Sequence, residues 1–333
     1  MKPADPTAED WRPTASRAML ECRASLLAGT RAFFADRGVL EVDTPLLVNA
    51  TVTDVHIHSA RVQLEPPSCA HFLHTSPEYA MKRLLAAGVG DIFQICHVIR
   101  AGERSRLHNP EFTLIEWYRA GFSLATLMSE VEQLVRALLG TSGEQRTCEH
   151  LSYRDAFLRE LGLDPLTASL ADLARLTRTI GYQAEHSPRP SLSAERDEHL
   201  ELLMGALVGP KLGRGALTFV DRYPASQAAL AQLDPHDARV ALRFELYCDG
   251  IELANGFQEL ASAAEQRARF QHDLQERGAR GLPALDIDER LLAALAAGLP
   301  ACAGVALGFD RLVMLATGAH HIDEVLTFPT SRA

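Results

Sequence analysis

Apolar residues recur at helical spacing from residue 16 onward. Leu27 and Phe34 lie on one stripe, Ser16 precedes it as a side chain that can cap a helix N-terminus, and Gly38 follows its end. The pattern predicts a helix with one buried face. The next apolar segment, residues 39–42, predicts a strand that ends at a Thr-Pro pair, because proline cannot donate to a strand ladder.

A second stripe begins after Ser123 and contains Leu127, Val131 and Leu134, with Gly140 just past its end. The spacing predicts another helix with one apolar face. We assign that face to the core and not to a cofactor-binding surface.

The pattern is weaker between residues 141 and 215. Helical spacing is visible over 152–161 and 195–207, interrupted by proline and glycine, and no group of residues there suggests chemistry. We interpret this region as scaffold. Residues 1–15 are polar and contain proline, so they are expected to be a flexible tail, and residues 16–333 are expected to form one catalytic domain.

Strand-like segments at 92–100 and 111–118 flank a charged loop and predict an antiparallel hairpin with a long tip. Side chains alternate between the two faces of a strand, so Phe112, Glu116 and Tyr118 share one face. On an isolated strand these would be ordinary sheet residues and a solvated charge. The composition of the loop beside them changes that interpretation.

The loop between these strands is rich in cationic side chains. Arg100, Arg104, Arg106 and His108 stand within a few residues of one another, next to Asn109. Arginine presents forked N–H donors that match the geometry of phosphate oxygens. The loop is therefore predicted to hold phosphate groups.

Asp249 and Gly250 form a two-residue turn signal between two apolar strands, which predicts a second hairpin. The expected register is Cys248–Ile251, Tyr247–Glu252, Leu246–Leu253 and Glu245–Ala254. Glu245 and Glu252 would then lie on the same face, as diagonal neighbours that can both reach one Mg²⁺ ion. Two ordinary solvated glutamates on a wet face are the alternative.

Residues 303–318 predict a strand of small residues that reaches Gly308 and then a helix. Asp310 and Arg311 lie in the first turn of that helix. Because the helix dipole disfavours a cation at this end, Arg311 is expected either to point into solvent or to face an anion.

Composition limits the class of protein. The 333 residues are 47% hydrophobic and 23% charged, enough for one large domain or two modest ones, and no run of about 18 apolar residues or signal-like N-terminus suggests a membrane protein. We expect a cytoplasmic protein. A formal net charge of −10 argues against a surface devoted to nucleic acid, so stable tRNA binding is not expected.

The cysteines lie far apart without a CxxC pair, which predicts reduced thiols and no zinc site. They are Cys22, Cys69, Cys96, Cys148, Cys248 and Cys302.

Three of the segments described above resemble known motifs. RGVLEVDTP at 37–45 resembles motif 1 of class II aminoacyl-tRNA synthetases, Arg100 with HNPEFTLIEWY at 108–118 resembles motif 2, and GFDRL at 308–312 resembles motif 3. The likeness is closest to lysyl-tRNA synthetases and extends from about residue 16 over nearly the whole chain. It implies an α+β fold, the class II synthetase catalytic domain, in which an antiparallel β-sheet is flanked by helices, and motif 1 implies a homodimer.

Lysyl-tRNA synthetases carry an anticodon-binding barrel before motif 1, and this chain is expected to lack one. In this respect, and in the segments TSPEYAMKRLL and GIELANGF, it resembles the EpmA family, also called PoxA or GenX. Members of that family attach (R)-β-lysine to a lysine of translation elongation factor P.

The resemblance implies roles for individual residues. Arg100 and Arg311 would be catalytic, holding the α- and γ-phosphates of ATP, and Phe112 would stack on adenine. The other residues of the ATP site would be Ala101, Gly102, Glu103, Asn109, Glu245, Leu246 and Gly308. The amino-acid pocket would contain Ser76, Pro77, Glu78, Glu116, Tyr118, Glu252, Glu259 and Ala306. Glu245 and Glu252 would bind Mg²⁺, and the many carboxylates would offset the lost hydration of the two ammonium groups of β-lysine.

Two positions depart from the family patterns. Lysyl and EpmA-type sequences have Arg-x-Glu in motif 2, whereas Arg100 is followed by Ala101, Gly102 and only then Glu103. Either Glu103 replaces the missing carboxylate, or backbone groups of Gly102 make the adenine contact. Ala306 stands where lysyl-tRNA synthetases have glycine and the EpmA type has alanine, and one methyl group discriminates ligands by about 1 to 3 kcal/mol.

The resemblance implies an ATP-dependent ligase that needs no covalent enzyme nucleophile. It would activate (R)-β-lysine as an adenylate and transfer it to a lysine side chain of elongation factor P. Two alternatives stay open: a compact lysyl-tRNA synthetase-like enzyme acting on tRNA or a small molecule, and a catalytically silent regulatory paralogue.

Overall fold

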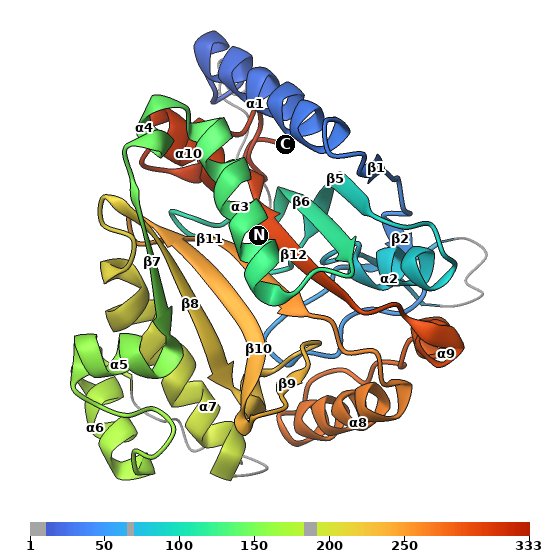
Figure 1. Cartoon of the computed structure of the whole chain (residues 1–333), viewed down its shortest axis with the longest axis vertical. Helices are drawn as coiled ribbons and strands as arrows, with labels where there is room; N and C mark the ends of the chain where they lie inside the picture. The colour runs from blue at the N-terminus through green and yellow to red at the C-terminus, as the bar shows by residue number, and fades with distance from the viewer. Residues whose placement is uncertain (1–10, 65–69, 183–191) are drawn as a thin grey trace.

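The computed structural model describes residues 11–64, 70–182 and 192–333 of the chain. Within these residues the larger of two sheets has nine strands: β1 (Leu40–Glu41), β5 (Ile92–Ile99), β6 (Glu111–Ala120), β7 (Thr147–Ser152), β8 (Ala216–Pro224), β9 (Leu233–Asp234), β10 (Asp237–Cys248), β11 (Ile251–Gln258) and β12 (Cys302–Gly308). Their order is β1–β5–β6–β12–β11–β10–β8–β7, with β9 paired to β10. Helices pack on this sheet and around its edges (Figure 1).

The predicted α+β fold, with a sheet flanked by helices, is confirmed, and all but the outermost pairs of the large sheet are antiparallel. At the edges, β1 pairs with β5 and β7 pairs with β8 in parallel. A parallel pair needs a crossover connection. The crossovers contain α2 (Glu78–Ala86) before β5, and α5 (Tyr153–Leu161), α6 (Leu170–Thr179) and α7 (Leu192–Leu203) before β8.

Three helices cover one face of the sheet: α1 (Arg17–Ala35), α3 (Leu124–Leu139) and α10 (Phe309–Thr317). The two predicted helices begin at their expected caps, since Ser16 Oγ accepts from Met19 N at 3.3 Å and Ser123 Oγ accepts from Thr126 N at 3.2 Å. The core under these helices includes Leu26, Phe34, Ile115, Trp117, Leu127, Val131, Leu134, Phe244, Leu246, Val305, Leu307 and Leu312.

Both predicted hairpins form, as β5–β6 and β10–β11. Asp249 and Gly250 have φ of 50° and 77°, the positive values that a two-residue hairpin turn needs. The register is as predicted for Cys248–Ile251 and Tyr247–Glu252 only. Beyond a bulge, the pairs are Leu246–Ala254 and Glu245–Asn255, in place of the predicted Leu246–Leu253 and Glu245–Ala254. A bulge places one extra residue on one strand, and alternation along a sequence cannot reveal it.

The region 141–215 forms a helical layer beside β7 and β8. Its apolar core includes Tyr153, Phe157, Leu173, Leu203 and Val208. The predicted segments correspond to α5 and to α7 with the short helix η1 (Met204–Val208), whereas β7 and α6 were not predicted. The smaller helices of this part are α4 (Thr141–Glu144) and η2 (Gly209–Lys211).

A third apolar cluster joins α2 to α8 (Ala263–Ala279) and α9 (Glu289–Gly298). It includes Met81, Leu85, Ile92, Phe270 and Leu292. The remaining elements are the small sheet β2 (Leu47–Val48), β4 (His71–Leu73) and β3 (Arg61–Val62), and the short helices η3 (Ala225–Gln227) and η4 (Ile322–Glu324).

Residues 1–10 of the expected tail, and Cys69, lie outside the described residues. At the described end of that segment, Thr14 N donates to Thr327 O at 3.0 Å and Ala15 is buried. The boundary at residue 15 stays a prediction. The other five cysteines are free thiols. Across the described ranges, no helix combines the length and the apolar character that a membrane crossing requires.

A buried ion pair connects α1, β6 and α10. The Arg23 guanidinium contacts Asp310 Oδ1 and donates to Thr113 Oγ1 at 2.7 Å, while Thr113 N donates to Asp310 Oδ2 at 2.7 Å. Asp310 is 1% exposed. The first turn of α10 is therefore fixed to the sheet and to α1 by charge-assisted hydrogen bonds.

Replacing Asp310 with alanine should destabilise the fold by about 3 kcal/mol, because a partly buried arginine and a backbone N–H lose their acceptor. Urea unfolding followed by circular dichroism measures this. Glu21→Ala, which removes the exposed partner of Arg17, is the control and should leave the unfolding midpoint unchanged. An Asp310→Ala midpoint equal to that of the control would contradict the role of the ion pair.

Candidate active site

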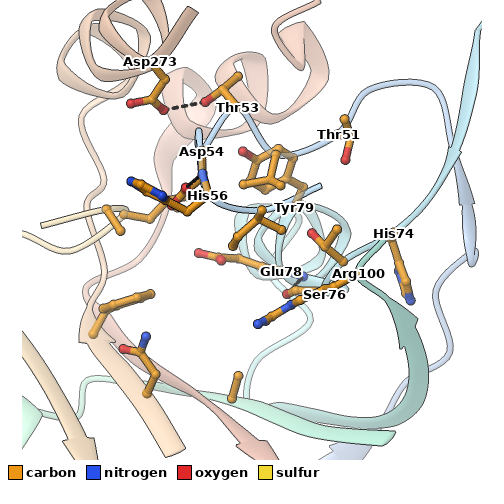
Figure 2. A pocket seen from close by; sticks show the side chains of 18 of the residues that line it. Thr51, Thr53, Asp54, His56, His74, Ser76, Glu78, Tyr79, Arg100 and Asp273 are labelled. Carbon is orange, nitrogen blue, oxygen red and sulfur yellow. Dashed lines mark hydrogen bonds between the residues drawn. The ribbon is translucent and has the colours of Figure 1, made fainter. Parts of the chain in front are cut away.

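A cavity of about 1210 Å³ opens on the face of the sheet that α1 and α3 do not cover. It is lined by residues of β6, β10, β11 and β12, by the β5–β6 loop, by segment 49–57, and by α7 and α8. Figure 2 shows Thr53 donating to Asp273 (2.6 Å) in one part of the cavity, with Ser76, Glu78 and Arg100 in another. The volume exceeds that of most single-ligand pockets, so two substrates can bind together.

The alternation of β6 places its side chains as predicted. Phe112, Glu116 and Tyr118 line the cavity, while Ile115 and Trp117 belong to the core on the other face. The same strand therefore stabilises the fold with one face and forms the site with the other.

Glu116 is buried among hydroxyl groups. Tyr118 Oη donates to Glu116 Oε1 and Ser76 Oγ donates to Glu116 Oε2, both at 2.7 Å. Burial, with repulsion from the Glu78 carboxylate, raises the pKa of Glu116 to about 7. The carboxyl group is thus held in place and titrates near neutrality.

A second acidic group is built around a lysine. Lys82 Nζ donates to Glu78 Oε1 at 2.6 Å and forms an ion pair with Glu259 Oε2 at 2.6 Å. Burial raises the pKa of Glu259 to about 8, although the Lys82 ammonium acts in the opposite direction. A Cβ atom added at Gly304 would overlap the Tyr118 ring and Glu259 Oε1, so glycine is needed there.

Cationic groups gather elsewhere in the same cavity. The Arg100 guanidinium lies 5.3 Å from the centre of the Phe112 ring, and its buried Nε has no hydrogen-bond partner among the residues that the structure describes. Arg311 donates to the backbone oxygen of Glu252 at 2.8 Å. Its Nη1 also lies 3.4 Å from Glu252 Oε2, so Arg311 faces an anion at the cavity instead of pointing into solvent, which is one of the two predicted outcomes.

His108 lies between the two arginines and is neutral. Burial, with the positive charges of Arg311 and Arg100, lowers the pKa of His108 to about 4. Its Nε2 is 2.7 Å from Arg311 Nη2, and its Nδ1 is 2.7 Å from Ser105 Oγ. Since arginine can only donate, Nε2 accepts and the proton is on Nδ1. His108 therefore orients Arg311 without adding a charge.

The structure separates the cationic residues of the loop into two groups, and phosphate binding stays a prediction for those that line the cavity. Arg104 contacts both Asp323 carboxylate oxygens, at 2.6 and 2.5 Å, and Arg106 donates to His320 O at 3.2 Å. These two arginines attach the loop to the C-terminal segment and do not line the cavity. The sequence could not separate them from Arg100, because their anionic and carbonyl partners lie more than 200 positions away.

The two predicted metal ligands differ in their surroundings. Glu252 lines the cavity, and burial with repulsion from Glu245 raises its pKa. Glu245 accepts from Arg243 Nη2 and from Tyr247 Oη, both at 2.6 Å. A carboxylate keeps further lone pairs in such contacts. Because Glu245 does not line the cavity, Glu252 is the one of the two carboxylates that is accessible to a hard cation there.

The predicted site residues divide into those that line the cavity and those that do not. The cavity is lined by Ser76, Pro77, Glu78, Arg100, Glu103, Asn109, Phe112, Glu116, Tyr118, Glu252, Glu259, Ala306, Gly308 and Arg311. The predicted site residues that do not line it are Ala101, Gly102, Glu245 and Leu246. Of the two alternatives for the altered motif 2, the structure places the side chain of Glu103 at the cavity and Gly102 away from it, with φ of 84°.

Several cavity residues were not predicted. Arg243 was missed, although it shares a strand face with Glu245. Lys82, which does not line the cavity but contacts two residues that do, was also missed, although it follows Glu78 by one helical turn. Asp197 and Glu201 of α7 also line the cavity. The interpretation of 141–215 as scaffold alone is therefore incomplete, because a helix far away in sequence reaches the site.

Comparison with known proteins identifies the family of the chain and its relatives. A family model described as tRNA synthetases class II (D, K and N) matches residues 7–332. The chain belongs to this family. It is 49% identical over 327 residues to the elongation factor P–(R)-β-lysine ligase of Klebsiella pneumoniae, which covers 97% of this chain and 98% of the relative. The proteins of the same name from Vibrio vulnificus and Vibrio cholerae are 49% and 48% identical, covering 96% and 98% of this chain and 98% and 100% of those relatives.

The raised pKa values of Glu116 and Glu259 predict how binding depends on pH. An ammonium ligand needs ionised carboxylates, so below pH 7 to 8 it must displace protons. Affinity for a diamino acid should rise between pH 6 and 8.5, by up to about tenfold per pH unit for each proton released. Calorimetric titration measures it. Glu116→Gln should remove the part of the dependence centred near pH 7, and constant affinity over this range in the unmodified protein would contradict the assignment.

Gly304→Ala should weaken binding of a diamino acid at least tenfold, since the added methyl displaces Tyr118 and Glu259. The same titration measures the loss. Gly278→Ala is the matched control, because its added methyl meets no atom within 4 Å in α8. Equal affinities for the two variants would show that Gly304 is not needed by the pocket.

Proposed function

We propose that this protein is an ATP-dependent ligase that activates (R)-β-lysine as an adenylate and transfers it to a lysine side chain of translation elongation factor P. The observation that carries the proposal is the single cavity in which a carboxylate-rich part and an arginine-rich part adjoin. The names of relatives at about 49% identity supply the acceptor protein and the lysine isomer of the proposal.

The acidic part of the cavity suits a substrate with two ammonium groups. Glu78, Glu116 and Glu259 converge there with Lys82, so their summed charge is negative when they are ionised. Removing ammonium groups from water is favourable only if charged, hydrogen-bonded partners replace the water. Ala306 lines the cavity and pairs with Glu116 in the β12–β6 ladder, so its methyl group would help to distinguish the position of an amine along the substrate chain.

The arginine-rich part suits a nucleoside triphosphate. Arg100 has an unsatisfied Nε, Arg311 is held by Glu252 and His108, and Phe112 offers a ring face for adenine. Glu103 lines the cavity and would contact the base in the altered motif 2. Glu252 with Glu245 would hold Mg²⁺, which supplies neutralising charge for the phosphates when bound.

The reaction then follows from positioning. A carboxylate oxygen of the amino acid attacks the α-phosphorus, the bond to the bridging oxygen breaks, and diphosphate leaves. Arg100 and Arg311 stabilise the negative charge on the transferring and departing groups. In the second step the neutral ε-amine of the acceptor lysine attacks the activated carbonyl, an amide forms and AMP leaves. No side chain of the protein becomes acylated.

We further propose that the protein is a cytoplasmic homodimer that does not bind tRNA stably. Leu40 in the edge strand β1 is 54% exposed, and Leu46 nearby in sequence is 41% exposed. Apolar residues at a sheet edge favour contact with a second copy.

The decisive test is incubation of elongation factor P with ATP, this protein and either lysine isomer, followed by intact-mass analysis. One added lysyl unit with (R)-β-lysine is expected. A parallel incubation with tRNA tests the alternative, since transfer to tRNA instead of elongation factor P would favour a compact synthetase. Diphosphate exchange with ATP tests both enzymatic functions, and its absence with both lysine isomers would exclude them.

Arg100→Met should lower the diphosphate exchange rate about 10²- to 10³-fold, because a preorganised donor to the transition state is lost. Arg106→Met is the matched control in the same loop, since Arg106 contacts His320 O outside the cavity. Equal rates for the two variants would exclude Arg100 from the reaction.

A further inference from the structure

Lys82 is a buried cation in an acidic pocket that has to receive cations. It is 1% exposed, lies on α2 one turn after Glu78, and does not line the cavity itself. Its Nζ is 2.6 Å from Glu78 Oε1 and 2.6 Å from Glu259 Oε2. It is also one of only three lysines among 33 lysines and arginines, the others being Lys2 and Lys211.

The oxygen atoms of the pocket divide into held and free ones. Both oxygens of Glu116 accept from hydroxyl groups. Glu259 Oε2 forms an ion pair with Lys82 at 2.6 Å. Oε1 has no hydrogen-bond partner among the described residues and lies beside Gly304 and Tyr118 at the cavity. Lys82 thus holds Glu259 from behind and leaves one buried oxygen for a ligand.

The net charge of the acidic pocket also indicates a role for Lys82 in binding the substrate. With Glu78, Glu116 and Glu259 ionised, Lys82 reduces three negative charges to a net of two. Two is the number of ammonium groups on a diamino acid. An ammonium ion is a compact charge with three donors, and the Lys82 Nζ atom lies 2.6 Å from one carboxylate oxygen of each of Glu78 and Glu259.

We propose that Lys82 is a positioning residue for the diamino acid: it aligns Glu78 and Glu259 and adjusts the charge of the pocket to that of the two ammonium groups. The inference rests on the proposed function and extends it to a residue that contacts no substrate. Lys82 remains charged because the two carboxylates outweigh its burial and raise its pKa.

The titratable groups around the Lys82–Glu259 ion pair come from four elements. They are Glu78 and Lys82 on α2, Glu116 and Tyr118 on β6, Cys302 on β12, and Cys96 on β5, which faces Glu116. Among them Lys82 supplies the positive charge. Without it, Glu259 should retain its proton to a higher pH.

Lys82→Met keeps most of the side-chain volume and removes the charge. In diphosphate exchange at pH 7 we expect KM for β-lysine to rise at least tenfold with a smaller change in kcat. The acid limb of the KM profile should move upward by about one to three pH units. Lys211→Met, at an exposed lysine outside the cavity, is the control and should match the unmodified protein.

A double variant restores the balance. Lys82→Met with Glu78→Gln removes one charge of each sign, so it should fold even if the single variant does not, and should recover part of the affinity. A KM defect that is the same at every pH and unrelieved by Glu78→Gln, or no defect, would overturn the proposal.

Calorimetric titration of the unmodified protein and the Lys82 variants with lysine isomers measures affinity without depending on turnover. Absence of exchange in the unmodified protein would count against the proposed function. Unchanged diamine affinity in Lys82→Met would count against the role of Lys82.

Discussion

Repulsion among buried carboxylates is the constraint on which the site depends. Glu116 and Glu259 lie almost fully out of water, with Glu78 beside them, and burial raises the pKa of both. Two hydroxyl groups and Lys82 hold these oxygens in place but leave the charge incompletely balanced. A bound diamine would complete the balance, so the energy that destabilises the empty pocket becomes binding energy for a dication.

The large sheet allows the fold to tolerate these buried carboxylates. One face of β6, β11 and β12 packs against α1, α3 and α10, and the other face is left for polar chemistry. The buried contact of Arg23 with Asp310 fixes the first turn of α10, next to Arg311. Stability therefore comes mainly from the apolar face, while the opposite face can hold charges that would not stabilise a core.

The arginines of the cavity illustrate the same division between support and chemistry. Arg104 and Arg106 hold the β5–β6 loop against the C-terminal segment, and neutral His108 orients Arg311. Arg100 keeps an unsatisfied buried N–H. Pairing some cations internally leaves the remaining ones positioned for phosphate oxygens with little reorganisation.

The sequence by itself determined the two capped helices, both hairpins and the shared face of Phe112, Glu116 and Tyr118, because local spacing and turn chemistry fix these features. Only the tertiary structure decided the bulge beside Tyr247, the parallel edge pairs, the separate uses of Arg100 and Arg104, and the place of Lys82 between two carboxylates. These depend on residues distant in the chain, such as Glu259 and Asp323, whose approach is set by packing and charge and leaves no periodic signal.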